Sequence, residues 1–142
     1  MAEKKDFVGV WRLVSYVFID AGGTVSYPFG MEPRGYIVYT ADGYMSVNMM
    51  PSGRPNFRTA ELLGGSTEEK ARAVDTFLSY CGTYDVQGDQ VIHHVEVSLL
   101  PNWSDGDQRR FYQLDGRRLT LSTAPQLLRG KVQTPVLVWE RV

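Results

Sequence analysis

Short runs of β-branched and aromatic residues, separated by turn residues, make up most of the chain. Such runs predict β-strands, because strand side chains alternate between two faces and Val, Ile, Thr, Tyr, Phe and Trp suit a pleated surface. The dipeptide Asp42-Gly43 gives the strongest hairpin signal, and other glycines and prolines mark further turns. The pattern predicts strands over residues 7–20, 24–27, 35–40, 44–50, 82–86, 91–98, 108–114, 119–123 and 136–142.

One stretch follows the period of a helix instead. Ser66 and Glu69 form the S-x-x-E pattern of a capping box, and apolar residues then recur on one helical face as far as about Tyr80. The sequence therefore predicts a helix from Ser66 to about Tyr80. Two roles remain open for it: a lid or plug across one opening of the sheet, or a crossover connection whose apolar stripe covers the core.

The close spacing of the strands favours an antiparallel up-and-down barrel or sandwich over alternating βα units. We therefore predict an all-β fold, a single antiparallel barrel of about eight or nine strands with one helix. A closed sheet of about eight strands holds either packed side chains or one small ligand in its central cavity. A chain of 142 residues is most simply one domain. We place this domain at residues 7–142, after a flexible N-terminus at residues 1–6.

Composition and charge argue against several classes of protein. A net charge of −1, with scattered lysines and arginines, offers no basic patch for nucleic acid. No run approaches the roughly 20 apolar residues that a membrane helix needs. The charged start of the chain lacks the apolar core of a signal peptide, and the single cysteine, Cys81, excludes an internal disulfide. We expect a cytoplasmic protein that binds neither nucleic acid nor a membrane.

Both histidines of the chain are adjacent in the predicted strand 91–98. Successive strand residues point to opposite faces, so one of His93 and His94 faces the interior and the other faces outward. If His94 is inside, Glu96 shares its face and places a carboxylate beside an imidazole. If His93 is inside, its companions are three valines and the interior there is apolar. The pattern leaves this choice open.

An inward His94 would allow an acid–base site. Glu96 would share its face, and Arg110 and Tyr112, which share a face of the next predicted strand, would meet it if the two strands pair. An arginine that polarises a carbonyl and a phenol that donates a proton would serve isomerisation, cyclisation or dehydration without a cofactor. A buried structural network of the same side chains is the alternative. We predict no metal site, because His94 and Glu96 supply at most two ligands.

Aromatic and polar residues of the central strands are candidates for the wall of a ligand site. Ser46 and Asn48 alternate with methionines, so one face of that strand is polar and the other apolar. Trp103 lies in an expected loop, where it caps a ligand at the barrel mouth or packs on the rim. We predict that the ligand-binding residues are Tyr39, Ser46, Asn48, Tyr84 and Trp103.

Three residues at the two ends of the chain carry a family resemblance. Gly9 and Trp11 start the first strand and Arg141 ends the last. The chain resembles the lipocalin-like domain family of bacterial and fungal calycin-type barrels at these three residues, and the resemblance extends over nearly all of residues 7–142. The resemblance implies that Gly9 permits close backbone approach and that Arg141 stacks on Trp11 at one end of a small antiparallel barrel. It implies a central cavity but no agreed reaction.

Three functional hypotheses follow. The first is a barrel that binds a small, mostly hydrophobic metabolite in its central cavity. The second is a cofactor-independent cyclase, isomerase or dehydratase that acts in the same cavity on a polyketide-like or other carbonyl metabolite, with His94, Glu96, Arg110 and Tyr112 as its catalytic residues. The third is a structural domain without a cavity that dimerises through exposed strands. The partner in the first two is a small molecule, and the sequence allows a monomer or a homodimer.

Overall fold

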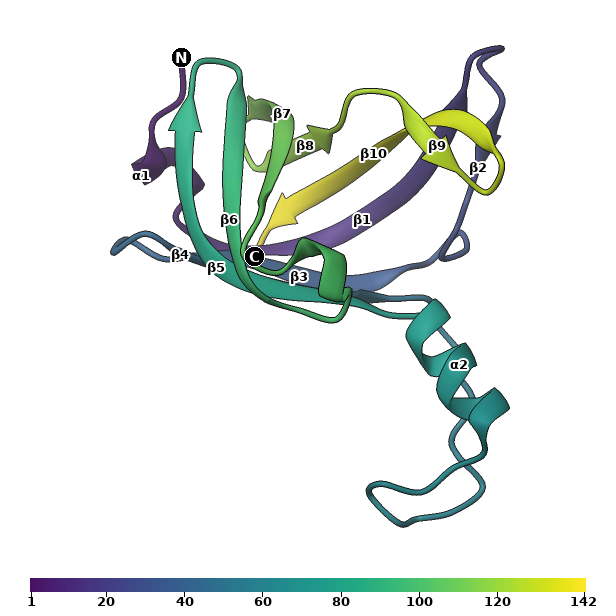
Figure 1. The fold of residues 1–142 in the computed structure, drawn as a ribbon. Helices are drawn as coiled ribbons and strands as arrows, with labels where there is room; N and C mark the ends of the chain where they lie inside the picture. The colour runs from purple at the N-terminus through teal and green to yellow at the C-terminus, as the bar shows by residue number, and fades with distance from the viewer.

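A closed eight-stranded antiparallel barrel forms the body of the protein in a computed structural model that describes all residues 1–142 (Figure 1). The sheet order is β2-β1-β3-β4-β5-β6-β7-β8-β10-β9, and pairing of β1 with β10 closes it. Strands β2 and β9 extend the sheet beyond the closed barrel. The predicted all-β barrel is confirmed. The strands are β1 (Gly9–Asp20), β2 (Val25–Ser26), β3 (Arg34–Tyr39), β4 (Tyr44–Met50), β5 (Leu78–Gln87), β6 (Gln90–Ser98), β7 (Asp107–Asp115), β8 (Arg118–Ser122), β9 (Gln126–Leu128) and β10 (Lys131–Arg141).

Alternation along the strands places one side of each in the core. In β4, Met45, Val47 and Met49 are buried, whereas the residues between them are exposed or half-buried. Strand β6 breaks this rule near its end. Cys81 of β5 pairs with Val97, but the next residue of β5 pairs with Val95, so Glu96 is an extra residue in a β-bulge. The bulge reverses the alternation, and Val97 is 65% exposed.

One end of the barrel is closed by the N-terminal segment. The short helix α1 (Lys4–Phe7) carries the fully buried Phe7, whose carbonyl accepts a hydrogen bond from the indole of Trp11 at 2.8 Å. Arg141 lies 4.1 Å from the Trp11 ring centroid and donates to the carbonyls of Asp6 and Val8. The stacking that the family resemblance implied is therefore present. The structure places α1 where we expected the end of a flexible N-terminus.

The predicted helix is shorter and lies elsewhere than expected. Helix α2 (Thr67–Asp75) begins with the predicted capping box, in which Ser66 accepts from the Glu69 backbone at 3.1 Å. It buries none of its residues and projects away from the barrel (Figure 1). Both expected roles are wrong, because α2 neither covers an opening nor lies over the core. Residues from Leu78 onward belong to β5, where their apolar side chains face the barrel.

The stretch between the predicted strands 119–123 and 136–142 also differs from the expectation, which placed no strand there. Strand β9 lies within it, and β10 begins at Lys131 rather than near residue 136. Pro135 lies within β10, opposite Phe18 of β1, and its carbonyl accepts a hydrogen bond from the backbone N–H of Thr123. A proline lacks only the N–H group, so it is tolerated where that donor is not needed. The short 3-10 helix η1 (Pro101–Trp103) follows β6. None of the helices has the length and apolar character required to span a membrane.

Candidate functional site

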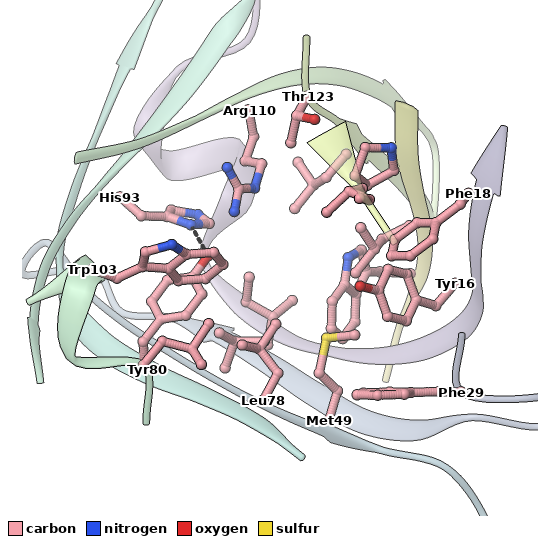
Figure 2. Close-up of a pocket in the computed structure, with 18 of the residues that line it drawn as sticks. Tyr16, Phe18, Phe29, Met49, Leu78, Tyr80, His93, Trp103, Arg110 and Thr123 are labelled. Carbon is pink, nitrogen blue, oxygen red and sulfur yellow. Dashed lines mark hydrogen bonds between the residues drawn. The ribbon is translucent and has the colours of Figure 1, made fainter. Parts of the chain in front are cut away.

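A cavity of about 230 Å³ occupies the barrel interior (Figure 2). It is larger than the roughly 150 Å³ cavity that accepts benzene and slightly smaller than pockets for drug-sized ligands, which start near 300 Å³. Gln126 of β9 lines it and is exposed, so the cavity reaches the surface on that side. Of its 19 lining residues 14 are hydrophobic, so a bound molecule would exchange most of its water contact for apolar contact. The apolar walls include Phe18, Phe29, Met49, Leu121, Leu137 and Trp139.

His93 and Tyr80 lie on the polar side of the cavity, and Tyr39 contacts His93 from outside the lining. His93 is fully buried; its Nε2 is 2.7 Å from the Tyr39 hydroxyl and its Nδ1 is 2.7 Å from the Tyr80 hydroxyl. Burial, with Arg110 nearby, lowers the pKa of His93 well below its usual value. The imidazole is therefore neutral at physiological pH, with one nitrogen donating and the other accepting.

Arg110 brings the one permanent charge into the cavity lining. Its guanidinium carbon lies 5.9 Å from the ring centroid of Trp103, which in turn packs edge-on against Tyr80. Figure 2 shows Arg110, His93, Trp103 and Tyr80 on one side of the cavity. Arg110 forms no ion pair; its hydrogen-bond acceptors are the Gln108 side chain and the Arg109 carbonyl.

The opposite side is aromatic, with Tyr16, Phe18 and Phe29 (Figure 2). Tyr16 packs edge-on against both phenylalanines, and its hydroxyl makes no hydrogen bond within the protein. Burial raises the pKa of Tyr16 to about 12, so this hydroxyl is a neutral donor. The indole nitrogen of Trp139 is buried without a hydrogen-bond partner. The site thus offers hydrogen-bonding groups on two sides of an apolar space.

The predicted acid–base cluster is not assembled. His93, not His94, faces the interior, because the register of β6 with its neighbours turns odd-numbered residues before the bulge inward. His94 lies on the outer surface, where Asp107 contacts Nδ1 at 2.7 Å and Asp85 contacts Nε2 at 3.0 Å. These hydrogen bonds raise the pKa of His94. Glu96 is exposed, so neither member of the expected imidazole–carboxylate pair reaches the cavity.

Of the four predicted catalytic residues only Arg110 lines the cavity. Tyr112 shares its strand face, but it lies at the closed end, edge-on to Phe7 at 5.0 Å, and its hydroxyl donates to the Gly88 carbonyl at 2.7 Å. That hydroxyl therefore forms its hydrogen bond at the closed end of the barrel and does not reach the cavity. No group of three or more His, Cys, Asp or Glu side chains is placed to bind a metal ion.

Of the predicted ligand-binding residues, only one lines the cavity. Trp103 lines the cavity. Ser46 and Asn48 lie on the outer face of β4, where Asn48 accepts from Ser79, so their placement in the wall was wrong. Tyr39 and Tyr84 are buried but lie outside the lining; Tyr84 donates to the Thr40 carbonyl.

Sequence reasoning missed several lining residues, above all Tyr16, Tyr80 and His93. Tyr80 was assigned to the end of the helix, and His93 was the other alternative for the inward position. Tyr16 belongs to the first predicted strand, whose apolar residues gave no sign of which would line a cavity. Alternation from Trp11 and Leu13 points to Ser15 instead, because a bulge in β1 between Leu13 and Ser15 moves the inward face to Tyr16.

Comparison with known protein families agrees with this architecture. A family model described as a lipocalin-like domain matches residues 8–142. The chain belongs to the lipocalin-like domain family. It is 35% identical over 107 residues to a protein of Aspergillus oryzae (strain ATCC 42149 / RIB 40) named 4'-hydroxy-3'-methoxypropiophenone carrier protein ppsC, covering 69% of this chain and 96% of that protein. A crystal structure of an uncharacterized protein from Bacteroides eggerthii DSM 20697 matches with a TM-score of 0.47 and 13% identity, over 96% of this chain and 99% of that chain.

Proposed function

We propose that this lipocalin-like barrel binds and carries a small aromatic metabolite in its central cavity. The observation that carries the proposal is the 230 Å³ cavity with mostly apolar walls and hydrogen-bonding groups on two sides. Its volume suits a molecule of one or two rings. The carrier name of the Aspergillus relative supports the same role, and its aryl ketone has the size and the apolar character that such a cavity accepts.

The chemistry of the lining favours binding over catalysis. A general base should have a pKa near the working pH, but burial lowers the pKa of His93 well below this range. Both of its ring nitrogens are already hydrogen-bonded to tyrosines. The cavity therefore holds a ligand by contact and hydrogen bonding, without a group poised to move its protons.

A volume-filling pair of variants tests the proposal. Leu137 and Val138 are neighbours in β10, and only Leu137 lines the cavity. Leu137→Trp fills part of the space, whereas Val138→Trp adds the same ring outside it. We expect saturable binding of the aryl ketone 2-acetonaphthone to the wild type and to Val138→Trp, measured by titration calorimetry, and binding at least tenfold weaker in Leu137→Trp.

Melting temperatures of both variants check that they are folded. The proposal would be contradicted if neither this ketone nor the corresponding acid, 2-naphthoate, bound saturably to the wild type. Equal binding by a folded Leu137→Trp variant would also contradict it, because the ligand would then occupy another site.

A further inference from the structure

The polar side of the cavity presents hydrogen-bond donors and a positive charge without an acidic partner. No aspartate or glutamate lines the cavity. Arg110 takes part in no ion pair, and its acceptors within the chain are the neutral Gln108 amide and a backbone carbonyl. A guanidinium has five N–H donors and no acceptor. Most of its hydrogen-bonding capacity therefore remains free for a bound molecule.

The hydrogen bonds of His93 add a second donor at this place. Tyr39 is fully buried and the imidazole is its only hydrogen-bond partner, so its O–H group must donate to Nε2 to avoid a buried donor without an acceptor. Nδ1 of the neutral ring then carries the proton and donates to the Tyr80 oxygen. The hydrogen of the Tyr80 hydroxyl is thereby left free. Because Tyr80 lines the cavity, it is available to the ligand.

We propose that the natural ligand is a small aromatic carboxylic acid, bound as its anion, with the carboxylate held by the Arg110 guanidinium and the Tyr80 hydroxyl and the ring against the apolar wall. The inference rests on the proposed carrier function and specifies its ligand class. A carboxylate matches the two parallel N–H groups of a guanidinium and carries the opposite charge, whereas a ketone offers a single neutral oxygen. The guanidinium carbon of Arg110 lies 5.9 Å from the Trp103 ring centroid, within cation–π range, and this contact favours its position at the cavity.

The charge distribution also explains which compounds the site rejects. An anion in an apolar cavity without a partner would be strongly disfavoured by desolvation. Arg110 removes that penalty for an anion, whereas a cation would meet the guanidinium with no acid to offset the repulsion. Arg129, whose guanidinium carbon lies 5.9 Å from the Phe18 ring centroid, adds a second positive charge near the opposite wall. The site therefore selects by charge as well as by shape.

Two probes of nearly equal shape test the inference. In 2-naphthoate an ionised oxygen stands where 2-acetonaphthone has a methyl group, so the acid and the ketone differ chiefly in charge. Titration calorimetry at neutral pH and low salt gives both dissociation constants. We expect the wild type to bind the acid at least tenfold more tightly than the ketone.

Variants of β7 assign the preference to one side chain. Arg110→Met is expected to abolish the preference for the acid. Arg110→Lys keeps the positive charge but lacks the two parallel N–H groups of the guanidinium, and it is expected to retain part of the preference. Arg109→Met is the matched control, because Arg109 is the exposed neighbour on the outer face. It is expected to bind both probes like the wild type. Tyr80→Phe is expected to weaken binding of the acid more than binding of the ketone.

The outcomes separate this inference from the proposed function. Wild-type binding of the ketone as tightly as the acid overturns the anion preference but leaves the carrier function standing. An acid preference that survives in Arg110→Met overturns the assigned contact. Binding of neither probe contradicts the carrier function itself. The wild-type ratio decides the anion preference even if an Arg110 variant fails to fold.

Discussion

Replacement of His93 by Leu tests how the polar pair of tyrosines is held in the core. The side chains are similar in volume, so the change removes the hydrogen bonds of the imidazole while filling its space. Two contacts are lost, at 2.7 Å to Tyr39 and 2.7 Å to Tyr80. Tyr39 has no other partner and no access to solvent, whereas Tyr80 faces the cavity and can bind water there.

The cost follows from this difference. A net protein hydrogen bond contributes about 1 kcal/mol, and a buried polar group left without a partner costs about 1–3 kcal/mol. Adding the loss at Tyr80 to the orphaned hydroxyl of Tyr39 gives a destabilisation of about 2–4 kcal/mol. That is a large share of the roughly 5–15 kcal/mol typical of a domain. The second change Tyr39→Phe removes the orphaned group and is expected to restore about 1–3 kcal/mol.

Urea denaturation of the wild type, the two single variants and the double variant gives the four free energies of unfolding. The expected result is a double variant more stable than His93→Leu alone, although Tyr39→Phe by itself destabilises the wild type. Additive losses, with the double variant least stable, would refute the reasoning, because they would mean that the buried phenol has no unmet hydrogen bond in His93→Leu.

Three further perturbations test other parts of the molecule. Gly9 has φ of 135° and a Cβ there would lie 2.7 Å from Arg141 Nη1, so Gly9→Ala is expected to lower the free energy of unfolding in urea by about 1–3 kcal/mol. Ser66→Ala removes an N-cap worth about 1 kcal/mol; faster amide exchange within α2 with an unchanged urea midpoint is expected, because α2 buries no residue. The flanking aspartates raise the pKa of His94, so the folded state binds this proton more tightly than the unfolded chain does. The stabilisation is complete below the unfolded pKa of about 6.5 and is lost as the pH rises through the higher folded pKa, so the melting temperature of His94→Gln should fall furthest below that of the wild type in acid and least in alkali.

Strand propensity and turn chemistry were sufficient to predict the architecture. Runs such as residues 44–50 and the turn at Gly43 depend on neighbours in sequence, and the structure has a strand at the predicted bounds of Tyr44–Met50. The capping box at Ser66 is also local and is present. The end of α2 was misjudged because apolar spacing continued into β5. A short apolar run fits either period, and pairing with β4 decided in favour of a strand.

The candidate site depends on contacts between strands that are distant in sequence. Period 2 places His93 and His94 on opposite faces whatever the fold. Which of them is inside was decided by the register of β6 against β5 and β7, and the bulge at Glu96 then reversed the face of Val97. A register is a sum over many cross-strand contacts, and a shift of one residue exchanges every side chain between the core and solvent.

The sequence by itself therefore determined an all-β barrel and a pair of histidines of which one must face inward, whereas the stacking of Arg141 on Trp11 was implied by the family resemblance. Local propensity and alternation depend only on consecutive residues, so they can be inferred without the partner strand. Only the tertiary structure decided that His93 lies between two phenols, that Arg110 enters the cavity without an acidic partner, and that His94 binds aspartates outside. Those properties arise from the closure of the sheet, which sets the neighbours, the burial and thus the pKa of each group.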